Sequence, residues 1–259
     1  MKTDDQGIKV HNKTLTAIMI VFALFLWEVL AGLKIINPFY SSRPSVIFLD
    51  FYHFFISGEL SMHLLITLKE ALAGLFLGTA AGVLVGVVLG RVRWVADIFG
   101  PIITALYGIP KLALAPIFIL WFGLGMESKI FISGLLVFYL VFFSTFEGIR
   151  SVNADMVSAI KLMGANRFQI YRSVILPSCV PWILTGIRGG IGASLLGAIV
   201  GEYMGASAGL GWMVQYATTT YQVERVMSCL LVLLFIGLVF NRGLSFYEGR
   251  LLKWRPDNR

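Results

Sequence analysis

Six long apolar runs dominate this sequence of 259 residues. A run of about 18 or more apolar residues is long enough to cross the hydrocarbon core of a bilayer as a helix. A chain of this length cannot wrap six such helices in polar surface, which excludes a large soluble protein with buried helices. We therefore predict an all-α integral membrane protein with about six transmembrane helices, Leu15–Leu33, Leu64–Gly90, Ile98–Leu120, Ile130–Phe146, Val180–Gly201 and Ser228–Phe246.

The distribution of Lys and Arg predicts the orientation of these spans. With the N-terminus inside, the inner loops hold fourteen of these cations and the outer loops hold four, and short cytoplasmic loops are the ones that are enriched in them. Both termini are therefore expected in the cytoplasm, and the net charge of +7 reflects topology rather than a nucleic-acid partner. The inner set is Lys2, Lys9, Lys13, Arg91, Arg93, Arg150, Lys161, Arg167, Arg172, Arg242, Arg250, Lys253, Arg255 and Arg259, and the outer set is Lys34, Arg43, Lys129 and Arg225.

A polar segment between the fourth and fifth apolar runs has a helix–turn–helix pattern. Asn153 or Asp155 can cap a first short helix, and Gly164 can end it, because glycine takes the left-handed conformation at the lowest cost. Asn166 can cap a second short helix over Arg167–Ser173. The next span then follows within a few residues.

The second short helix carries three large side chains, Phe168, Ile170 and Tyr171. A polar loop would leave them exposed, so either a partner protein or the surface of the bilayer is needed to cover them. Pro177 follows at a position that suits the first turn of the fifth span, where no amide donor is needed.

Three motifs resemble those of ABC-importer permeases, closest to the nitrate, sulfonate and taurine branch. Ser158 to Pro177 is similar to the cytoplasmic coupling loop, whose family pattern is Glu-Ala-Ala-x3-Gly-x9-Ile-x-Leu-Pro. The second motif is the run 108–116 (Gly-Ile-Pro-Lys-Leu-Ala-Leu-Ala-Pro), followed by 119–123 (Ile-Leu-Trp-Phe-Gly), and the third is the run 205–211 (Gly-Ala-Ser-Ala-Gly-Leu-Gly). The sequence departs from the loop pattern at Ser158 for Glu, Ile160 for Ala and Val174 for Ile.

The resemblance implies a type I ABC importer permease fold in the cell membrane. The implied domains are an N-terminal tail, first helix and external loop over 1–59, the permease domain over 60–246, and a cytoplasmic tail over 247–259. The implied function is to form the translocation pathway for a small, anionic solute of the nitrate, sulfonate or taurine kind. The implied ATPase-coupling residues are Ser158, Ala159, Met163, Gly164, Ala165, Arg167, Phe168, Tyr171, Leu176 and Pro177.

The same resemblance implies a set of partners. They are two ABC ATPase subunits, an extracytoplasmic solute-binding protein and a second permease, expected to be another copy of this chain. ATP and Mg²⁺ are expected on the ATPase, with no cofactor in this chain. The sequence has no Gly-x4-Gly-Lys-Ser/Thr phosphate loop, no His/Cys metal spacing and no nucleophile arrangement, so neither catalysis nor a metal site is predicted.

Two other classes of membrane protein remain as alternatives. An ion-coupled secondary transporter would typically show internal repeats and acidic residues at the midplane, and we find no clear repeat. A membrane scaffold without transport activity would not need a loop that turns and docks.

Ionisable residues inside a span are costly and are usually paired or functional. Lys111 and Glu70 fall at a similar depth, so they can form an ion pair, or Lys111 can attract an anionic solute. Arg188 lies closer to the cytoplasm and can extend its guanidinium towards it. Pro110 and Pro116 remove backbone hydrogen bonds from the third span, which makes that span the best candidate for lining a pathway. The candidate pathway residues are Pro110, Lys111, Pro116, Glu70 and Arg188.

The second span has a glycine at every fourth position, and these residues form one narrow stripe. Small residues at this spacing let a second helix approach closely in lipid. The stripe can serve for packing alone or as a sliding surface during gating. Its members are Gly74, Gly78, Gly82, Gly86 and Gly90.

Overall fold

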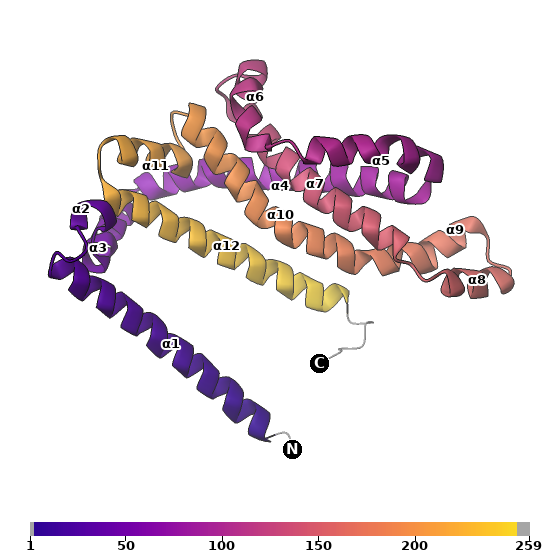
Figure 1. The fold of residues 1–259 in the computed structure, drawn as a ribbon, viewed down its shortest axis with the longest axis horizontal. Helices are drawn as coiled ribbons and strands as arrows, with labels where there is room; N and C mark the ends of the chain where they lie inside the picture. The colour runs from indigo at the N-terminus through magenta and orange to yellow at the C-terminus, as the bar shows by residue number, and fades with distance from the viewer. Residues whose placement is uncertain (1–2, 253–259) are drawn as a thin grey trace. The chain divides into compact units, whose positions relative to one another are not determined.

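A computed structural model describes residues 3–252 of the chain, and all regular elements of this range are helices. The described residues group into two compact units, one formed by 3–61 and Met213–Leu231, the other by Met62–Trp212 and 232–252. Figure 1 follows the elements in chain order. They are α1 (Thr3–Gly32), α2 (Pro38–Ser41), α3 (Pro44–Ile56), α4 (Glu59–Arg91), α5 (Arg93–Tyr107), a 3₁₀ helix (Lys111–Leu114), α6 (Ala115–Phe122), α7 (Met126–Arg150), α8 (Ala154–Leu162), α9 (Arg167–Ile170), a π-helical turn (Tyr171–Ile175), α10 (Leu176–Gly205), α11 (Leu210–Thr219) and α12 (Val223–Leu251).

Five helical stretches of the described residues are long and apolar enough to cross a bilayer, in agreement with five of the predicted spans. The predicted span Ile98–Leu120 is different, because it consists of two short helices that bend by 81° between Tyr107 and Lys111. Pro110 causes this break: it has no N–H to donate, and it disfavours helical geometry at the residue before it. The pathway candidates Pro110 and Lys111 therefore lie at the bend rather than inside a straight span.

Helix α7 forms the core of the second unit, packed between α4 and α10 (Figure 1). The five glycines of the α4 stripe face α7, and a Cβ added at any of them would come within 3.0 Å of an α7 atom. On the other side, Gly197 and Gly201 bring α10 equally close to Ser133 and Lys129. In lipid, such close backbone contact is a main source of helix association, so these glycines hold α4 and α10 on α7.

A single methyl group on the stripe is expected to disturb this packing. In Gly82→Ala, the new Cβ would lie 2.9 Å from the Phe138 carbonyl oxygen and 3.0 Å from the Phe142 nitrogen. Because backbone atoms cannot move aside cheaply, we expect destabilisation of about 1–3 kcal/mol, measured as a lower midpoint of thermal unfolding in detergent. Gly243→Ala on α12 is the control, since nothing lies within 4 Å of its added Cβ; an equal loss in both variants would contradict the packing role.

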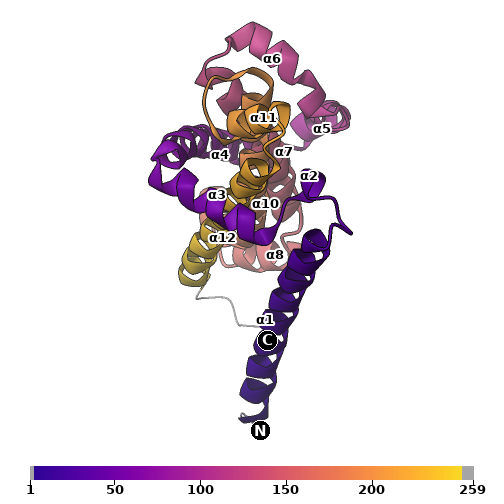
Figure 2. The ribbon, with the colours of Figure 1, turned by 90° about the vertical axis from the view of Figure 1, so that its left-hand side faces the viewer.

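The first unit contains two further helices where the external loop within 1–59 was expected. Pro38 and Pro44 are the first residues of α2 and α3, a position where proline's missing N–H costs nothing. Within this unit α3 runs across the direction of α1 (Figure 2). Glu28 of α1 accepts hydrogen bonds from the Ser45 amide at 3.0 Å and its hydroxyl at 2.8 Å, so this intramembrane carboxylate caps the start of α3.

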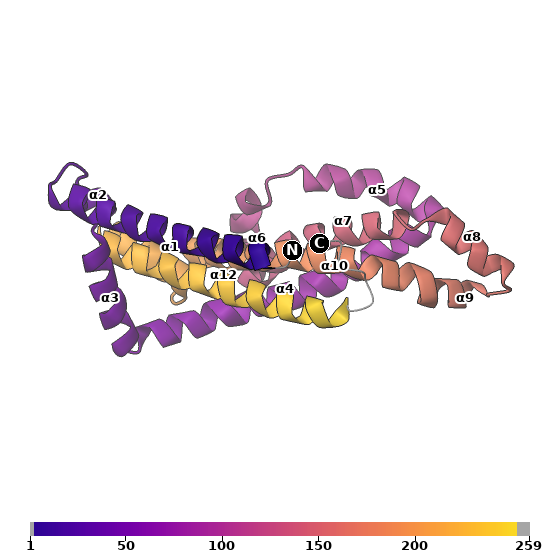
Figure 3. The same cartoon turned by 90° about the horizontal axis from the view of Figure 1, so that it is seen from below.

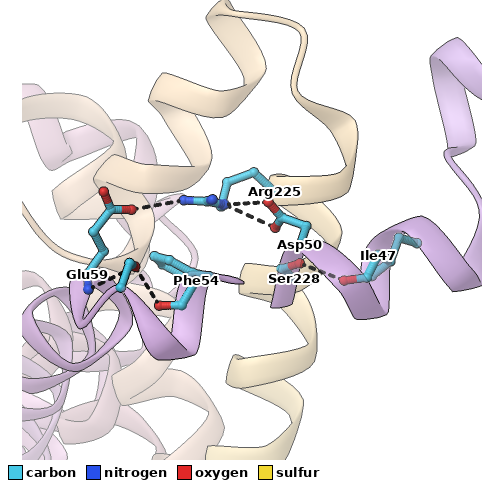
Figure 4. Close-up of polar contacts among 7 residues, drawn as sticks. Ile47, Asp50, Phe54, Glu59, Arg225 and Ser228 are labelled. Atoms are coloured by element: carbon cyan, nitrogen blue, oxygen red, sulfur yellow. Dashed lines mark hydrogen bonds and ion pairs between the residues drawn. The ribbon is translucent and has the colours of Figure 1, made fainter. Parts of the chain in front are cut away.

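An arginine near the start of α12 ties this unit together (Figure 4). The Arg225 Nε donates to both carboxylate oxygens of Asp50, at 3.1 and 3.0 Å, and its Nη1 lies 3.2 Å from Glu59. The guanidinium also lies 4.3 Å from the centroid of the Phe54 ring. A further bond runs from the Ser228 hydroxyl to the Ile47 carbonyl oxygen at 3.3 Å. The side chains of Arg225 and Asp50 are only 17% and 14% exposed, so α3 and the start of α12 are joined by a shielded ion pair.

The two acidic partners of Arg225 are expected to contribute unequally. Asp50→Asn removes a two-bond contact to a shielded charge and should cost about 2 kcal/mol of stability. Glu59→Gln alters a carboxylate that is 55% exposed and should cost less than about 1 kcal/mol. Thermal unfolding of the two single variants would check this order, and a larger loss in Glu59→Gln would refute it.

Candidate functional site

The predicted helix–turn–helix of residues 153–177 begins with a capped helix. Asn153 caps α8, its side chain accepting from the Asp155 amide at 2.7 Å. Gly164 lies in the left-handed region with φ of +85°. The Gly164 amide donates to the Lys161 carbonyl at 3.1 Å and the Ala165 amide to the Ile160 carbonyl at 3.3 Å. These two bonds form a Schellman motif, so Gly164 ends α8 as its sequence position predicted.

The second helix begins at Asn166 with a complete capping box. The Asn166 side chain accepts from the Gln169 amide at 2.9 Å, and the Gln169 side chain accepts from the Asn166 amide at 2.8 Å. The prediction of a separate helix over Arg167–Ser173 was wrong, because α9 continues through the π-helical turn into α10. Pro177 explains the wider turn, because it has no N–H to donate to the carbonyl four residues earlier. The amide of the preceding residue, Leu176, bonds the Tyr171 carbonyl five residues earlier, which is the π-helical pattern.

The tip of this segment exposes three large apolar side chains. Leu162 is 89% exposed, Met163 85% and Phe168 67%. Ile170, expected to be exposed, is buried, and Tyr171 is half-buried beneath the Arg91 guanidinium, 4.9 Å from its ring centroid. Figures 1 and 3 show α8 and α9 beyond the ends of α7 and α10 in the second unit. Of the other predicted coupling residues, the exposed ones are Ser158, Ala159, Gly164, Arg167 and Leu176, and the half-buried ones are Ala165 and Pro177.

This arrangement suits a docking surface for a protein. The end of α8 and the start of α9 are both capped by residues of the segment itself, so the turn is formed without a partner. The exposed Leu162, Met163 and Phe168 lie close together in the sequence, and exposed large apolar side chains are typical of an interaction surface. Because α9 runs into α10 without interruption, a force on the tip acts directly on a membrane-spanning helix.

The pathway candidates do not form one site. Lys111 donates to the Tyr107 carbonyl at 2.6 Å and lies 4.0 and 4.6 Å from the ring centroids of Tyr107 and Tyr139. The expected alternative of a Glu70–Lys111 pair is therefore wrong, because Glu70 lies beside Glu202 instead. Arg188 forms an ion pair with Glu248, which lies near the C-terminal end of α12. Pro116 lies in the first turn of α6.

A buried polar cluster in the second unit was not predicted. The Thr67 hydroxyl donates to Glu202 Oε1 at 2.7 Å and accepts from the Leu210 amide at 2.8 Å. The Gly211 amide donates to Glu202 Oε2 at 2.6 Å, and the Gly209 amide donates to His63 Nδ1 at 3.0 Å. The amides of Gly209 and Leu210 thus bond α4, and the amide of the next residue, Gly211, bonds Glu202 of α10.

Lys129 and Glu70 complete this cluster. Lys129 of α7 donates from its Nζ to the carbonyl oxygens of Leu124, Gly125 and Gly205. The Glu70 side chain forms a hydrogen bond with that of Glu202. A sequence signal did exist for part of the cluster. His63, Thr67 and Glu70 continue the α4 glycine stripe at helical spacing, so they face the same neighbouring helix.

Comparisons with known proteins agree on one family. Residues 74–253 match the model of the binding-protein-dependent transport system inner membrane component. The chain is 34% identical over 230 residues to the putative aliphatic sulfonates transport permease SsuC of Bacillus subtilis, covering 89% of this chain and 83% of that protein. It is 31% identical over 249 residues to the taurine transport system permease TauC of Escherichia coli, covering 94% and 90%.

A solved structure shows the same fold. The inward-facing MetNI methionine ABC transporter superposes with a TM-score of 0.61 at 20% identity, covering 74% of this chain and 93% of that chain. The helical architecture, the apolar spans and the family match are in agreement. The chain therefore belongs to the inner membrane components of binding-protein-dependent transport systems, the multi-pass permeases of ABC importers.

Proposed function

We propose that this permease is moved by a separate ATPase that docks on the 153–177 segment, with ATP and Mg²⁺ bound by that ATPase. The observation that carries the proposal is the exposed apolar tip on a turn that is already formed. With both termini in the cytoplasm, as the Lys and Arg distribution predicts, this tip lies on the side of the membrane where ATP is available. ATP-driven closure of two ATPase subunits would then push α9 and reorient α10.

The experiment is co-purification of the tagged chain with the ATPase in mild detergent. The test variant is Leu162→Ala with Phe168→Ala, which removes exposed apolar surface from the tip. The matched control is Leu120→Ala on α6, because Leu120 is 83% exposed and lies outside the segment. We expect the ATPase to be lost only from the test variant. Equal retention in both well-folded samples would reject docking at this segment.

We propose further that the solute is a small organic sulfonate or a similar anion, delivered by an extracytoplasmic binding protein. Two similar relatives are named for aliphatic sulfonates and taurine. Another relative, 30% identical over 240 residues and covering 93% of this chain and 90% of that protein, is the riboflavin transport permease RibX of Chloroflexus aurantiacus. Uptake of labelled taurine and labelled riboflavin by the reconstituted complex would separate the two chemistries, and uptake of riboflavin alone would reject the anion.

Lys111 is the residue that we propose to meet an anionic solute. It lies at the 81° bend, half-buried against Tyr107 and Tyr139. An ammonium group held over aromatic rings at membrane depth is available to an anion in a water-filled path. Lys111→Met should reduce anion uptake about tenfold, the effect of losing roughly 1.4 kcal/mol of interaction. Unchanged uptake would remove Lys111 from the pathway.

We propose that the second permease of the complex is another copy of this chain. The permease domain is proposed to cover 60–246. The mass of the purified complex, measured for the chain expressed with its ATPase alone, would test the pairing. A mass that needs a different second permease would reject it.

A further inference from the structure

Three ionisable side chains meet almost fully buried in the second unit. Glu70 on α4 is 2% exposed, Glu202 on α10 is 1% exposed and Lys129 on α7 is 1% exposed. His63 and Thr67 of α4 are also buried in this cluster. Charges in such surroundings are tolerated only when they are paired and hydrogen-bonded. The state of each group can therefore be worked out from its contacts.

Lys129 has no donor left for either carboxylate. An ammonium group has three N–H donors, and Nζ contacts three backbone carbonyl oxygens, those of Leu124, Gly125 at 2.9 Å and Gly205 at 2.6 Å. Lys129 is thus held as a cation by carbonyl oxygens. Its charge can balance one buried carboxylate through space, but not two.

Glu202 is that carboxylate. Both of its oxygens accept hydrogen bonds, Oε1 from the Thr67 hydroxyl at 2.7 Å and Oε2 from the Gly211 amide at 2.6 Å. Acceptance at both oxygens, one of them from a backbone amide, favours the ionised form. With Lys129 nearby, an ionised Glu202 leaves the pair with no net charge.

Glu70 then remains as the unbalanced group. Its side chain bonds that of Glu202, and two carboxyl groups can share a hydrogen bond only when one of them carries a proton. Its Oε2 is buried and has no hydrogen-bond partner. An ionised Glu70 would place a second negative charge against Glu202 with nothing to solvate it. Around it, the charged or titratable groups are Glu202 of α10, Lys129 of α7, Glu127 beside Lys129, and His63 of α4.

We propose that Glu70 and Glu202 form a binding site for a single proton. The proton is bonded to Glu70, which donates a hydrogen bond through it to Glu202. The bound proton keeps the cluster neutral and leaves Glu202 free to hold Gly211. Releasing it would set two carboxylates against each other beside the segment between α10 and α11. The proton therefore stabilises the contact of Glu70 on α4 with Glu202 on α10, the residue that holds the Gly211 amide. This inference depends on neither the solute nor the docking of the ATPase.

The first test is infrared spectroscopy of the purified full-length chain in nanodiscs. A buried carboxylic acid has a carbonyl stretch that is separate from the bands of carboxylates. We expect this band at neutral pH in the wild type, its loss in Glu70→Gln, and its retention in the exposed control Glu127→Gln. A wild-type spectrum without the band, or an unchanged band in Glu70→Gln, would overturn the proposal.

The second test compares stability and its pH dependence. Glutamine can donate to Glu202 as the protonated acid does, so Glu70→Gln should keep the wild-type unfolding midpoint at neutral pH. Glu202→Gln puts a donor where Glu202 accepts from Thr67 and Gly211, and should lower the midpoint. An unfolded glutamic acid releases its proton near pH 4.3, so wild-type stability should fall with rising pH by the linkage of one proton, and Glu70→Gln should lack that fall. Equal losses of stability in both variants would contradict the proposal and show that the cluster needs two carboxylates. Stabilisation of the wild type by Na⁺ at constant pH would also contradict it and show that the site binds a metal cation.

Discussion

Replacing Lys129 with methionine is expected to destabilise the protein more than any other single change considered for this chain. Methionine fills a similar volume but removes the ammonium group that donates to three backbone carbonyl oxygens. It also leaves the carboxylate of Glu202 without the nearby charge of Lys129. Removing one partner of a buried charge pair costs about 3–5 kcal/mol, which is a large part of the stability of most domains.

Thermal unfolding in detergent, followed by size-exclusion chromatography, would measure this loss. The matched control is Lys69→Met, because Lys69 lies on α4 close to the cluster in sequence but is exposed. We expect the control to keep the wild-type midpoint. If both variants unfold at the same temperature, Lys129 does not support the buried cluster.

Replacing Gly164 with valine is expected to cause loss of both the bound ATPase and solute uptake. Gly164 ends α8 with a positive φ of +85°, which costs a residue with a Cβ about 1–2 kcal/mol and a β-branched residue the most. No side chain would clash, since nothing lies within 4 Å of an added Cβ, so the effect is confined to the backbone of the turn. A penalty of this size reduces the population of the correctly formed tip about tenfold.

Asparagine at position 164 separates the effect of the backbone conformation of the turn from the effect of adding a side chain. Among residues with a Cβ it tolerates the left-handed region best. Gly164→Asn should therefore retain most uptake and most bound ATPase, while Gly164→Val loses both without losing its fold. The measurements are solute uptake and ATPase retention by the reconstituted complex. Similar activity of the two variants would show that the turn geometry is not what the ATPase requires.

The membrane-spanning helices were predictable because their signal is local. An apolar run of sufficient length forms a helix in lipid whatever surrounds it, and five of the six runs are continuous helices. The proline at 110 was identified as a break, but the size of the bend depends on where α5 and α6 pack. Helices α2 and α3 were missed because proline and glycine suggested a loop, whereas Pro38 and Pro44 begin helices.

The caps and the turn of the 153–177 segment were predicted because they are also local, whereas the separate second helix and the exposure of Ile170 were predicted wrongly. Asn153 and Asn166 cap helices as their side chains predict, and Gly164 takes the positive φ that the lack of a Cβ allows. The buried cluster could not be predicted in the same way, since it is assembled from α4, α7 and α10. Lys129 and Glu202 lie just at the ends of apolar runs, where counting along the sequence assigns them to outer loops.

The uninterrupted stretch from Arg167 to Gly205 has a consequence for communication across the membrane. It is a rod of 39 residues, and Phe168 and Glu202 lie near its two ends, separated by about 50 Å at 1.5 Å per residue. Thermodynamic linkage works in both directions. If nucleotide binding inside shifts this rod, then events at the far end, such as the arrival of a loaded binding protein, must alter nucleotide affinity by the same factor. One helix would thus link nucleotide binding in the cytoplasm to binding events on the outer side of the membrane.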